Sequence, residues 1–144
     1  MSASETKETV RAYLERVVSR GEPAAFDELC DPEMTFESPY TPEPVRGLDG
    51  FREMILGLRA AFPDLRIDER DLVAEGDLVA ARWVASGTHS GTSFAGVPAS
   101  GRRFEITGMS FYRVRDGRIV EGWVNDDNLG MLAQLGVVPA PSPV

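Results

Sequence analysis

The chain contains one cysteine, Cys30, and one histidine, His89. A single cysteine excludes an internal disulfide and a CxxC redox or metal motif. A single histidine excludes zinc sites that need several imidazole ligands. No stretch approaches the roughly 18 consecutive apolar residues of a membrane span, and the N-terminal stretch MSASETKETV lacks the apolar core of a secretory signal. We therefore expect a cytoplasmic protein that does not bind membranes.

Positive charge is scarce as well. The 144 residues include 15 Lys and Arg against 23 Asp and Glu, which gives a formal net charge of −8. A protein that binds nucleic acid needs a basic face for the phosphate backbone, so we expect no nucleic-acid partner. The length predicts a single domain over residues 1–144, in which residues 138–144 form a proline-rich tail.

Two amphipathic helices are predicted in the first half of the chain. One covers residues 4–20, and the other begins after Asp49 as its N-cap and ends before Pro63. A shorter helix begins at Pro23. The apolar stripes of the two long helices consist of Val10, Tyr13, Leu14, Val17 and Val18, and of Phe51, Met54, Ile55, Leu58 and Phe62.

The second half of the chain changes to the two-residue hydrophobic period of half-buried strands. This order, with helices before antiparallel strands, is typical of the α+β class, in which helices pack on the concave face of a curved sheet. A cavity between such a sheet and its helices is the default place for a ligand. The predicted strands cover 33–38, 65–73, 77–88, 102–115 and 118–125; a glycine-rich loop covers 89–101 and a last helix 128–135.

The strand at 102–115 divides its side chains between two faces. We expect Ser110 and Tyr112 to lie on the face that looks into the cavity. Met109 and Phe111 lie on the opposite face. Large apolar residues on an outer sheet face indicate a protein contact, so we expect a homodimer through the convex face of the sheet. We expect Trp83 and Trp123 to contribute to this contact together with Met109 and Phe111.

Six short stretches form a pattern through their order and spacing: RGLDGFREM (46–54), AFPDLRI (61–67), SGTHSG (86–91), GVPASGRRF (96–104), FYRVRDGRIVEGW (111–123) and DNLGMLAQLG (127–136). This pattern resembles the SnoaL-like polyketide cyclase family. The family has the cone-shaped α+β fold of nuclear transport factor 2 and ketosteroid isomerase. The resemblance implies a small-molecule cyclase of natural-product biosynthesis.

Three positions depart from the polar residues of the family's aldol cyclases. Those enzymes carry an acid/base Asp immediately after the position of Trp123, where this chain has Val124. They carry a His at the position of Ser110 and a polar residue at that of Phe36. We therefore expect the family's usual Asp-based aldol mechanism not to operate here, which favours a pericyclic or weakly acid/base-assisted ring closure.

Four side chains are candidate catalytic residues. Asp126 is either an inward carboxylate with a raised pKa or a cap of the last helix, the role that we expect for Asp127. Tyr13 and Tyr112 face inward and either donate to a developing oxyanion or only pack. His89 is either a general base or a residue of the turn at the rim.

We expect the remaining inward side chains to contact an apolar, polyketide-like substrate. Folding a flexible substrate into a reactive conformer accelerates ring closure even with few titrating groups. The predicted activity is therefore that of a cofactor-independent cyclase of lyase or isomerase type. The predicted substrate contacts are Phe36, Tyr40, Ile55, Leu58, Phe62, Ser110 and Val124.

Two alternatives remain open. A cofactor-free polyketide hydroxylase or an epoxide-opening cyclase would have Asp126, Glu37 or His89 inside the cavity. For epoxide opening, Glu37 and Asp64 are a candidate carboxylate pair, although alternation turns Glu37 outward. A non-catalytic binder of an apolar small molecule would have a cavity without an inward polar pair. The sequence has no glycine-rich phosphate loop and no metal-ligand cluster, so we expect neither an organic cofactor nor a metal.

Overall fold

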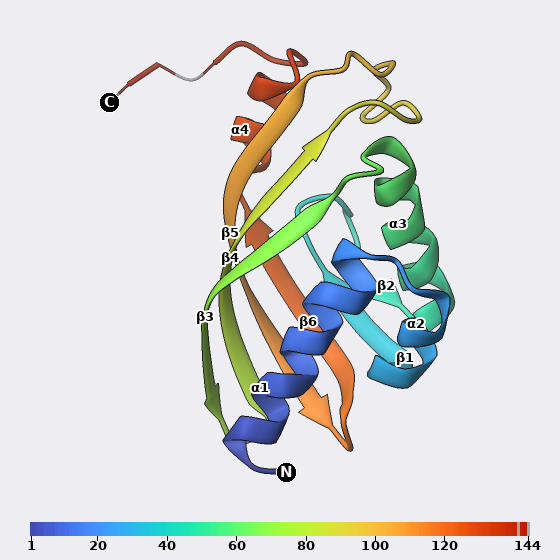
Figure 1. The fold of residues 1–144 in the computed structure, drawn as a ribbon, viewed down its shortest axis with the longest axis vertical. Helices are drawn as coiled ribbons and strands as arrows, with labels where there is room; N and C mark the ends of the chain where they lie inside the picture. Colours follow the sequence, from blue (N-terminus) through green and yellow to red (C-terminus); the bar gives the residue numbers. More distant parts are fainter. Residues whose placement is uncertain (141, 144) are drawn as a thin grey trace.

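The computed structural model describes residues 1–140 and 142–143 (Figure 1). Its elements follow in the order α1 (Ala3–Ala12), the π-helix η1 (Tyr13–Ser19), α2 (Pro23–Leu29), β1 (Cys30–Glu37), β2 (Val45–Arg46), α3 (Leu48–Ala61), β3 (Arg66–Glu75), β4 (Leu78–Thr88), β5 (Arg103–Arg115), β6 (Arg118–Asp126) and α4 (Asn128–Gln134). Among the described residues, no helix is long and apolar enough to cross a membrane.

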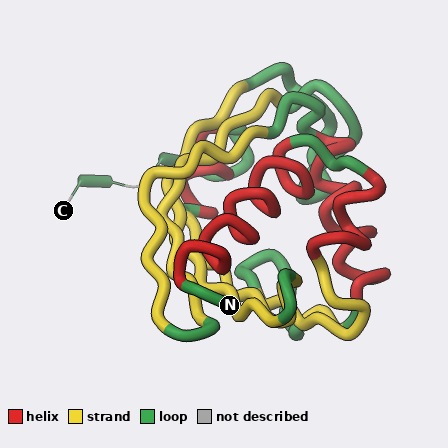
Figure 2. Tube along the Cα trace, turned by 60° about the horizontal axis from the view of Figure 1, so that its bottom comes forward, coloured by secondary structure: helices red, strands yellow, loops and turns green. Residues whose placement is uncertain are grey.

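The six strands form one curved sheet in the order β2-β1-β6-β5-β4-β3. Helix α1, the π-helix and α3 lie on its concave side (Figures 1 and 2). The predicted α+β class and the curved sheet with helices on its concave face are confirmed. The sheet is not antiparallel throughout, because β1 pairs with β6 in parallel. Strand β1 lies between helices in the sequence, and its partner β6 comes from the far end of the chain. Local sequence patterns do not reveal such a long-range parallel pairing.

The first predicted helix is one continuous segment with two geometries. A capping box of Ser2 and Glu5 begins α1, and the last seven residues follow the wider π-helix, η1. The Arg59 side chain donates hydrogen bonds to the carbonyl oxygens of Val18 and Ser19 at its end. The predicted apolar stripe is correct, whereas its π geometry was not expected.

The entry into α3 differs from the predicted one. Gly47 is the N-cap, with φ of 89° and ψ of 152°, a backbone conformation that only glycine adopts without strain. Asp49 therefore lies in the first turn of the helix and does not cap it. The two residues of β2 lie just before this glycine, in the proline-rich stretch 39–47, where the sequence predicts no strand.

One phenylalanine, Phe51, packs against both the neighbouring helices and the sheet. The Phe51 side chain of α3 is fully buried. Its ring centroid lies 6.1 Å from that of Tyr13, 6.3 Å from that of Phe26 and 5.1 Å from that of Phe36. Phe51 thus contacts η1, α2 and β1 at once, and aromatic pairs at these distances add to the hydrophobic gain of burial.

Replacing Phe51 with alanine is expected to lower the free energy of unfolding by about 3–5 kcal/mol, because a large cavity opens where four elements meet. Leu56→Ala on the same helix is the matched control. Leu56 is exposed, so its loss should change stability by less than about 0.5 kcal/mol. Urea denaturation of both variants measures the difference, and equal losses would contradict this assignment.

Candidate active site

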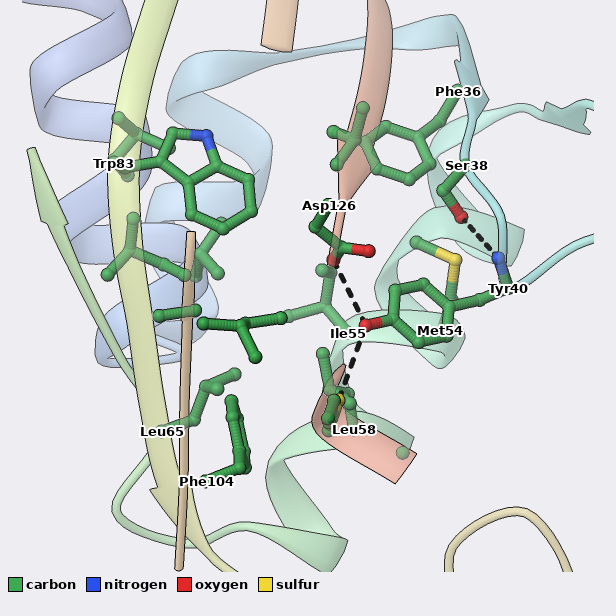
Figure 3. Close-up of a pocket in the computed structure, with 18 of the residues that line it drawn as sticks. Phe36, Ser38, Tyr40, Met54, Ile55, Leu58, Leu65, Trp83, Phe104 and Asp126 are labelled. Carbon is green, nitrogen blue, oxygen red and sulfur yellow. Dashed lines mark hydrogen bonds between the residues drawn. The ribbon is translucent and has the colours of Figure 1, made fainter. Parts of the chain in front are cut away.

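A cavity of about 210 Å³ lies between the concave face of the sheet and the helices η1 and α3 (Figure 3). Its walls are almost entirely apolar, and its polar groups are tyrosine and serine hydroxyls, one indole and one carboxylate. The residues that line it are Tyr13, Leu14, Val18, Phe36, Ser38, Tyr40, Met54, Ile55, Gly57, Leu58, Leu65, Ile67, Trp83, Ala85, Phe94, Phe104, Ile106, Tyr112, Val124, Asp126 and Met131.

The carboxylate is Asp126, the last residue of β6. The Tyr40 hydroxyl donates a hydrogen bond of 3.0 Å to its Oδ2 atom, and Figure 3 shows the two side chains meeting within the cavity. The Oδ1 atom is buried and has no hydrogen-bond partner among the described residues. One carboxylate oxygen is thus held by Tyr40, and the other is buried without a partner in the described part of the chain.

Side-chain contacts show which of the adjacent carboxylates, Asp126 or Asp127, caps the last helix. The Asp127 side chain accepts a hydrogen bond of 2.9 Å from the backbone N–H of Gly130, in the first turn of α4. Asp126 therefore does not act as the cap and extends β6 on its inner face. The alternative that places Asp126 in the cavity is the one that the structure shows.

Burial is the main cause of a raised pKa at Asp126, because apolar surroundings disfavour the charged carboxylate. The hydrogen bond from Tyr40 opposes this change, since it stabilises the charged form. The pKa of Tyr40 is raised as well, first by burial and then by the neighbouring carboxylate. Tyr40 therefore stays a neutral donor, whereas Asp126 is an acid whose proton affinity is increased.

Two further tyrosines line the cavity. The ring centroids of Tyr13 and Tyr112 lie 5.1 Å apart in an edge-to-face arrangement. Burial raises the pKa of Tyr112 to about 12 and that of Tyr13 well above its usual value. Both hydroxyls are neutral at physiological pH and can donate hydrogen bonds to a bound carbonyl.

Five of the seven predicted substrate contacts line the cavity: Phe36, Tyr40, Ile55, Leu58 and Val124. The other two do not. The Ser110 hydroxyl accepts a hydrogen bond of 3.0 Å from Nε1 of Trp83, whose indole covers it. Phe62 follows the end of α3 and packs against Phe104 and Phe94, behind the cavity wall.

The third misplaced residue is His89, which is buried but does not line the cavity. Its Nε2 atom lies 2.9 Å from the carbonyl oxygen of Thr92. Its ring packs against Phe62 and Phe94, and its backbone N–H donates to the carbonyl of Arg102. These contacts place His89 at the root of the loop 89–101, so the general-base alternative has no geometric support.

The carboxylate pair of the alternative mechanism is also absent from the cavity lining. Glu37 is exposed, as strand alternation predicts. Both carboxylate oxygens of Asp64 are bound by Thr88, through its backbone N–H and its hydroxyl. Asp64 thus binds Thr88 just after the end of α3, and Glu37 lies at the end of β1. Neither carboxylate lines the cavity.

The sequence predicts a dimer contact for Trp83 and assigns no cavity position to Phe94 or Met131, yet all three line the cavity. The predicted dimer contact of Trp83 is wrong, because its side chain is buried on the inner face of the sheet. Trp83 and Ala85 alternate with exposed and half-buried neighbours along β4, so the period of two could have placed Trp83 inward. Phe94 lies in the loop 89–101, where no period applies. Met131 receives a weak hydrogen bond of 3.4 Å from the Tyr40 hydroxyl at its sulfur, a contact without any local sequence signal.

A family model described as SnoaL-like polyketide cyclase matches residues 7–135. The chain belongs to this family. Aklanonic acid methyl ester cyclase DnrD of Streptomyces peucetius is 33% identical to it over 105 residues, which cover 72% of this chain and 70% of DnrD. These matches support a polyketide cyclase role and do not favour the hydroxylase or the passive binder.

Solved structures of the family agree with this fold. The crystal structure of IdmH from Streptomyces antibioticus, described as a candidate polyketide cyclase, shares 40% identity with a TM-score of 0.79, covering 92% of this chain and 99% of IdmH. A SnoaL-like protein from Jannaschia sp. CCS1 shares only 22% identity over 95% of each chain, yet its TM-score of 0.85 shows the same fold.

Removing the Tyr40 hydroxyl tests the geometry of the site. In Tyr40→Phe the pKa of Asp126 is expected to rise further, because the hydrogen bond that stabilises its charged form is lost. The unfolding free energy should fall by about 1–2 kcal/mol at a pH where Asp126 is ionised. A carbon-13 NMR titration of the Asp carboxyl groups measures the pKa. Tyr112→Phe is the control and should leave the Asp126 titration in place.

Proposed function

We propose that this chain closes a ring in a polyketide-like substrate by forming a carbon–carbon bond inside the cavity, with Asp126 as the acid/base. The observation that carries the proposal is the buried carboxylate with one oxygen held by Tyr40 and the other free. The membership in a cyclase family supports the reaction type. An inward carboxylate beside a tyrosine favours acid/base chemistry over a purely shape-driven, pericyclic closure.

The proposed reaction needs a substrate in which a C–H bond next to a carbonyl lies near a second carbonyl. The free Oδ1 atom of Asp126 takes the proton, and the electron pair of the C–H bond forms the enolate. The enolate carbon attacks the second carbonyl, whose C–O π electrons move to oxygen. The alkoxide oxygen then takes a proton, so the product is an isomer of the substrate.

No electrons leave the substrate in this sequence, so the proposed reaction requires neither a redox cofactor nor an oxidant. A product that keeps all its atoms makes the enzyme an isomerase, and a following loss of water would make it a lyase. The neutral hydroxyls of Tyr13 and Tyr112 are the proposed donors to the developing oxyanion.

The apolar walls contribute in two ways. They raise the pKa of Asp126 toward the range in which a carboxylate both accepts and returns protons at neutral pH. They also fold a flexible substrate so that its reacting atoms meet, and such orientation lowers the barrier by several kcal/mol. The aklanonic acid methyl ester in the name of DnrD is a reasonable first substrate to test.

Asp126→Asn is expected to lower the rate of ring closure by about 10²–10⁴-fold, because an amide cannot take the proton. Asp127→Asn is the matched control, since asparagine caps a helix about as well as aspartate and should retain activity. Purified variants are incubated with aklanonic acid methyl ester, and a product of unchanged mass is followed by liquid chromatography and mass spectrometry. Full activity of Asp126→Asn would point to shape-driven closure.

We also propose that two copies of the chain associate through the convex face of the sheet. Val73, Ala80, Phe111 and Trp123 lie opposite one another on neighbouring strands. Val73 is 66% and Phe111 50% exposed, and the nearby Met109 is 64% exposed. Apolar patches of this kind are typical of homodimer interfaces.

Phe111→Glu is expected to convert the dimer into a monomer, because it places a charge in the centre of the proposed interface. Leu129→Glu is the control. Leu129 is 55% exposed on α4, away from this face. Sedimentation equilibrium at micromolar concentration measures the mass of each variant. A wild-type chain that sediments as a monomer would refute the proposed dimer.

A further inference from the structure

Two contacts fix the position of the Trp83 side chain on the inner face of the sheet. Its Nε1–H group donates a buried hydrogen bond of 3.0 Å to the Ser110 hydroxyl. Its six-membered ring lies over Gly108, where an added Cβ would collide with the Cη2, Cζ3 and Cζ2 atoms. Position 108 must therefore be glycine because the Trp83 indole occupies the space of a Cβ, and not because of its backbone conformation. Both contacts lie on β5, so the indole lies across that strand.

An added Cβ at Gly108 would lie at nearly equal distances of less than 3.0 Å from three neighbouring ring atoms, and such nearly equal distances place it over the face of the six-membered ring. One face of the indole therefore lies on β5, and the other face points away from the sheet. Trp83 belongs to β4, and the strand on the other side of β5 is β6. The six-membered ring therefore extends across β5 toward β6, and the indole face that points away from the sheet lines the cavity. Trp83, Gly108 and Asp126 form one row, because Trp83 pairs with Gly108 and Gly108 pairs with Asp126. Figure 3 shows the six-membered ring directed to the side where Asp126 lies.

We propose that Trp83 is a specificity-determining residue, whose indole stacks on a planar, conjugated segment of the substrate and presents that segment to Asp126. This inference rests on the proposed function only for the role of Asp126. Three features carry it: the indole lines the cavity, it is fixed by a hydrogen bond, and the sheet leaves room for it through a glycine.

A planar segment fits this place better than a saturated one. A flat ring system contacts the whole indole face and gains dispersion and quadrupole interactions, which puckered saturated rings of the same carbon skeleton gain only in part. The wall thereby selects the flat part of a substrate and orients it.

The test compares two probes that share one skeleton, 2-naphthalenemethanol and trans-decahydro-2-naphthalenemethanol. Isothermal titration calorimetry measures their affinities for the full chain. The wild type is expected to bind the planar probe about three- to tenfold more tightly, as an aromatic pair contributes. Trp83→Leu should abolish this preference, and Trp83→Phe should keep part of it. Leu58→Ala removes an aliphatic wall residue and should weaken both probes alike.

A second measurement leaves Trp83 and the cavity unmutated. With 5-fluorotryptophan in place of tryptophan, the chain has two fluorine NMR signals, from Trp83 and Trp123, and Trp123→Phe assigns them. The planar probe should shift the Trp83 signal and leave that of Trp123 in place. An unchanged preference in Trp83→Leu, or a Trp83 signal that the probe does not move, would overturn the proposal.

These probes carry no acidic C–H group and do not react, so the binding test is separate from the test of catalysis. Asp126→Asn should keep the preference for the planar probe. A preference retained in Asp126→Asn together with full cyclase activity would refute the acid/base role alone. A lost preference in Trp83→Leu with normal binding of the saturated probe would support stacking regardless of the reaction.

Discussion

The pairing register between β5 and β6 decides which carboxylate enters the cavity. Gly108 lies opposite Asp126, so the Asp126 side chain shares the inner face. Asp127 follows on the opposite side and caps α4. Successive strand residues alternate between faces, and a slip by one residue would exchange the two. An irregularity in the ladder sets this register: Val114 lies opposite Ile119 but Arg113 lies opposite Glu121, so the pairing shifts by one residue between the hairpin turn and Asp126. In the turn itself, Asp116 and Gly117 both have positive φ, 51° and 74°, as a two-residue hairpin of matching twist requires.

A carboxylate held in this way reduces stability in part of the pH range. Burial raises the pKa of Asp126 in the folded chain above its unfolded value. Its contribution to stability is therefore fully present below the unfolded pKa and is lost as the pH rises through the folded pKa. The hydrogen bond from Tyr40 limits this loss, because it stabilises the charged form. The charged form of Asp126 is thus stabilised by the Tyr40 hydroxyl rather than by contact with water.

Periodicity predicted which side of an element a residue faces, and this was enough for the fold class and for Phe36, Tyr112 and Val124. It could not predict what lies between an inward residue and the cavity. Ser110 faces inward as predicted, yet the indole of Trp83 covers it. The partner of Asp126 was beyond sequence reasoning for another reason: Tyr40 is 86 residues away in a proline-rich loop, where no period constrains the direction of a side chain.

The position of the carboxylate also distinguishes this chain from the aldol cyclases that it resembles. Their Asp lies at the position of Val124, and Asp126 lies two residues further along the same strand face. Two residues of a strand span about 7 Å, a distance of several carbon–carbon bonds. In the proposed reaction, the base would therefore act on a different carbon of a substrate that binds against the same helices. It also lies in the row of Trp83 and beside Tyr40, so proton transfer and substrate stacking meet at one end of the cavity. One family fold can in this way close different rings, since its curved sheet offers several inward positions on β6 for a single carboxylate.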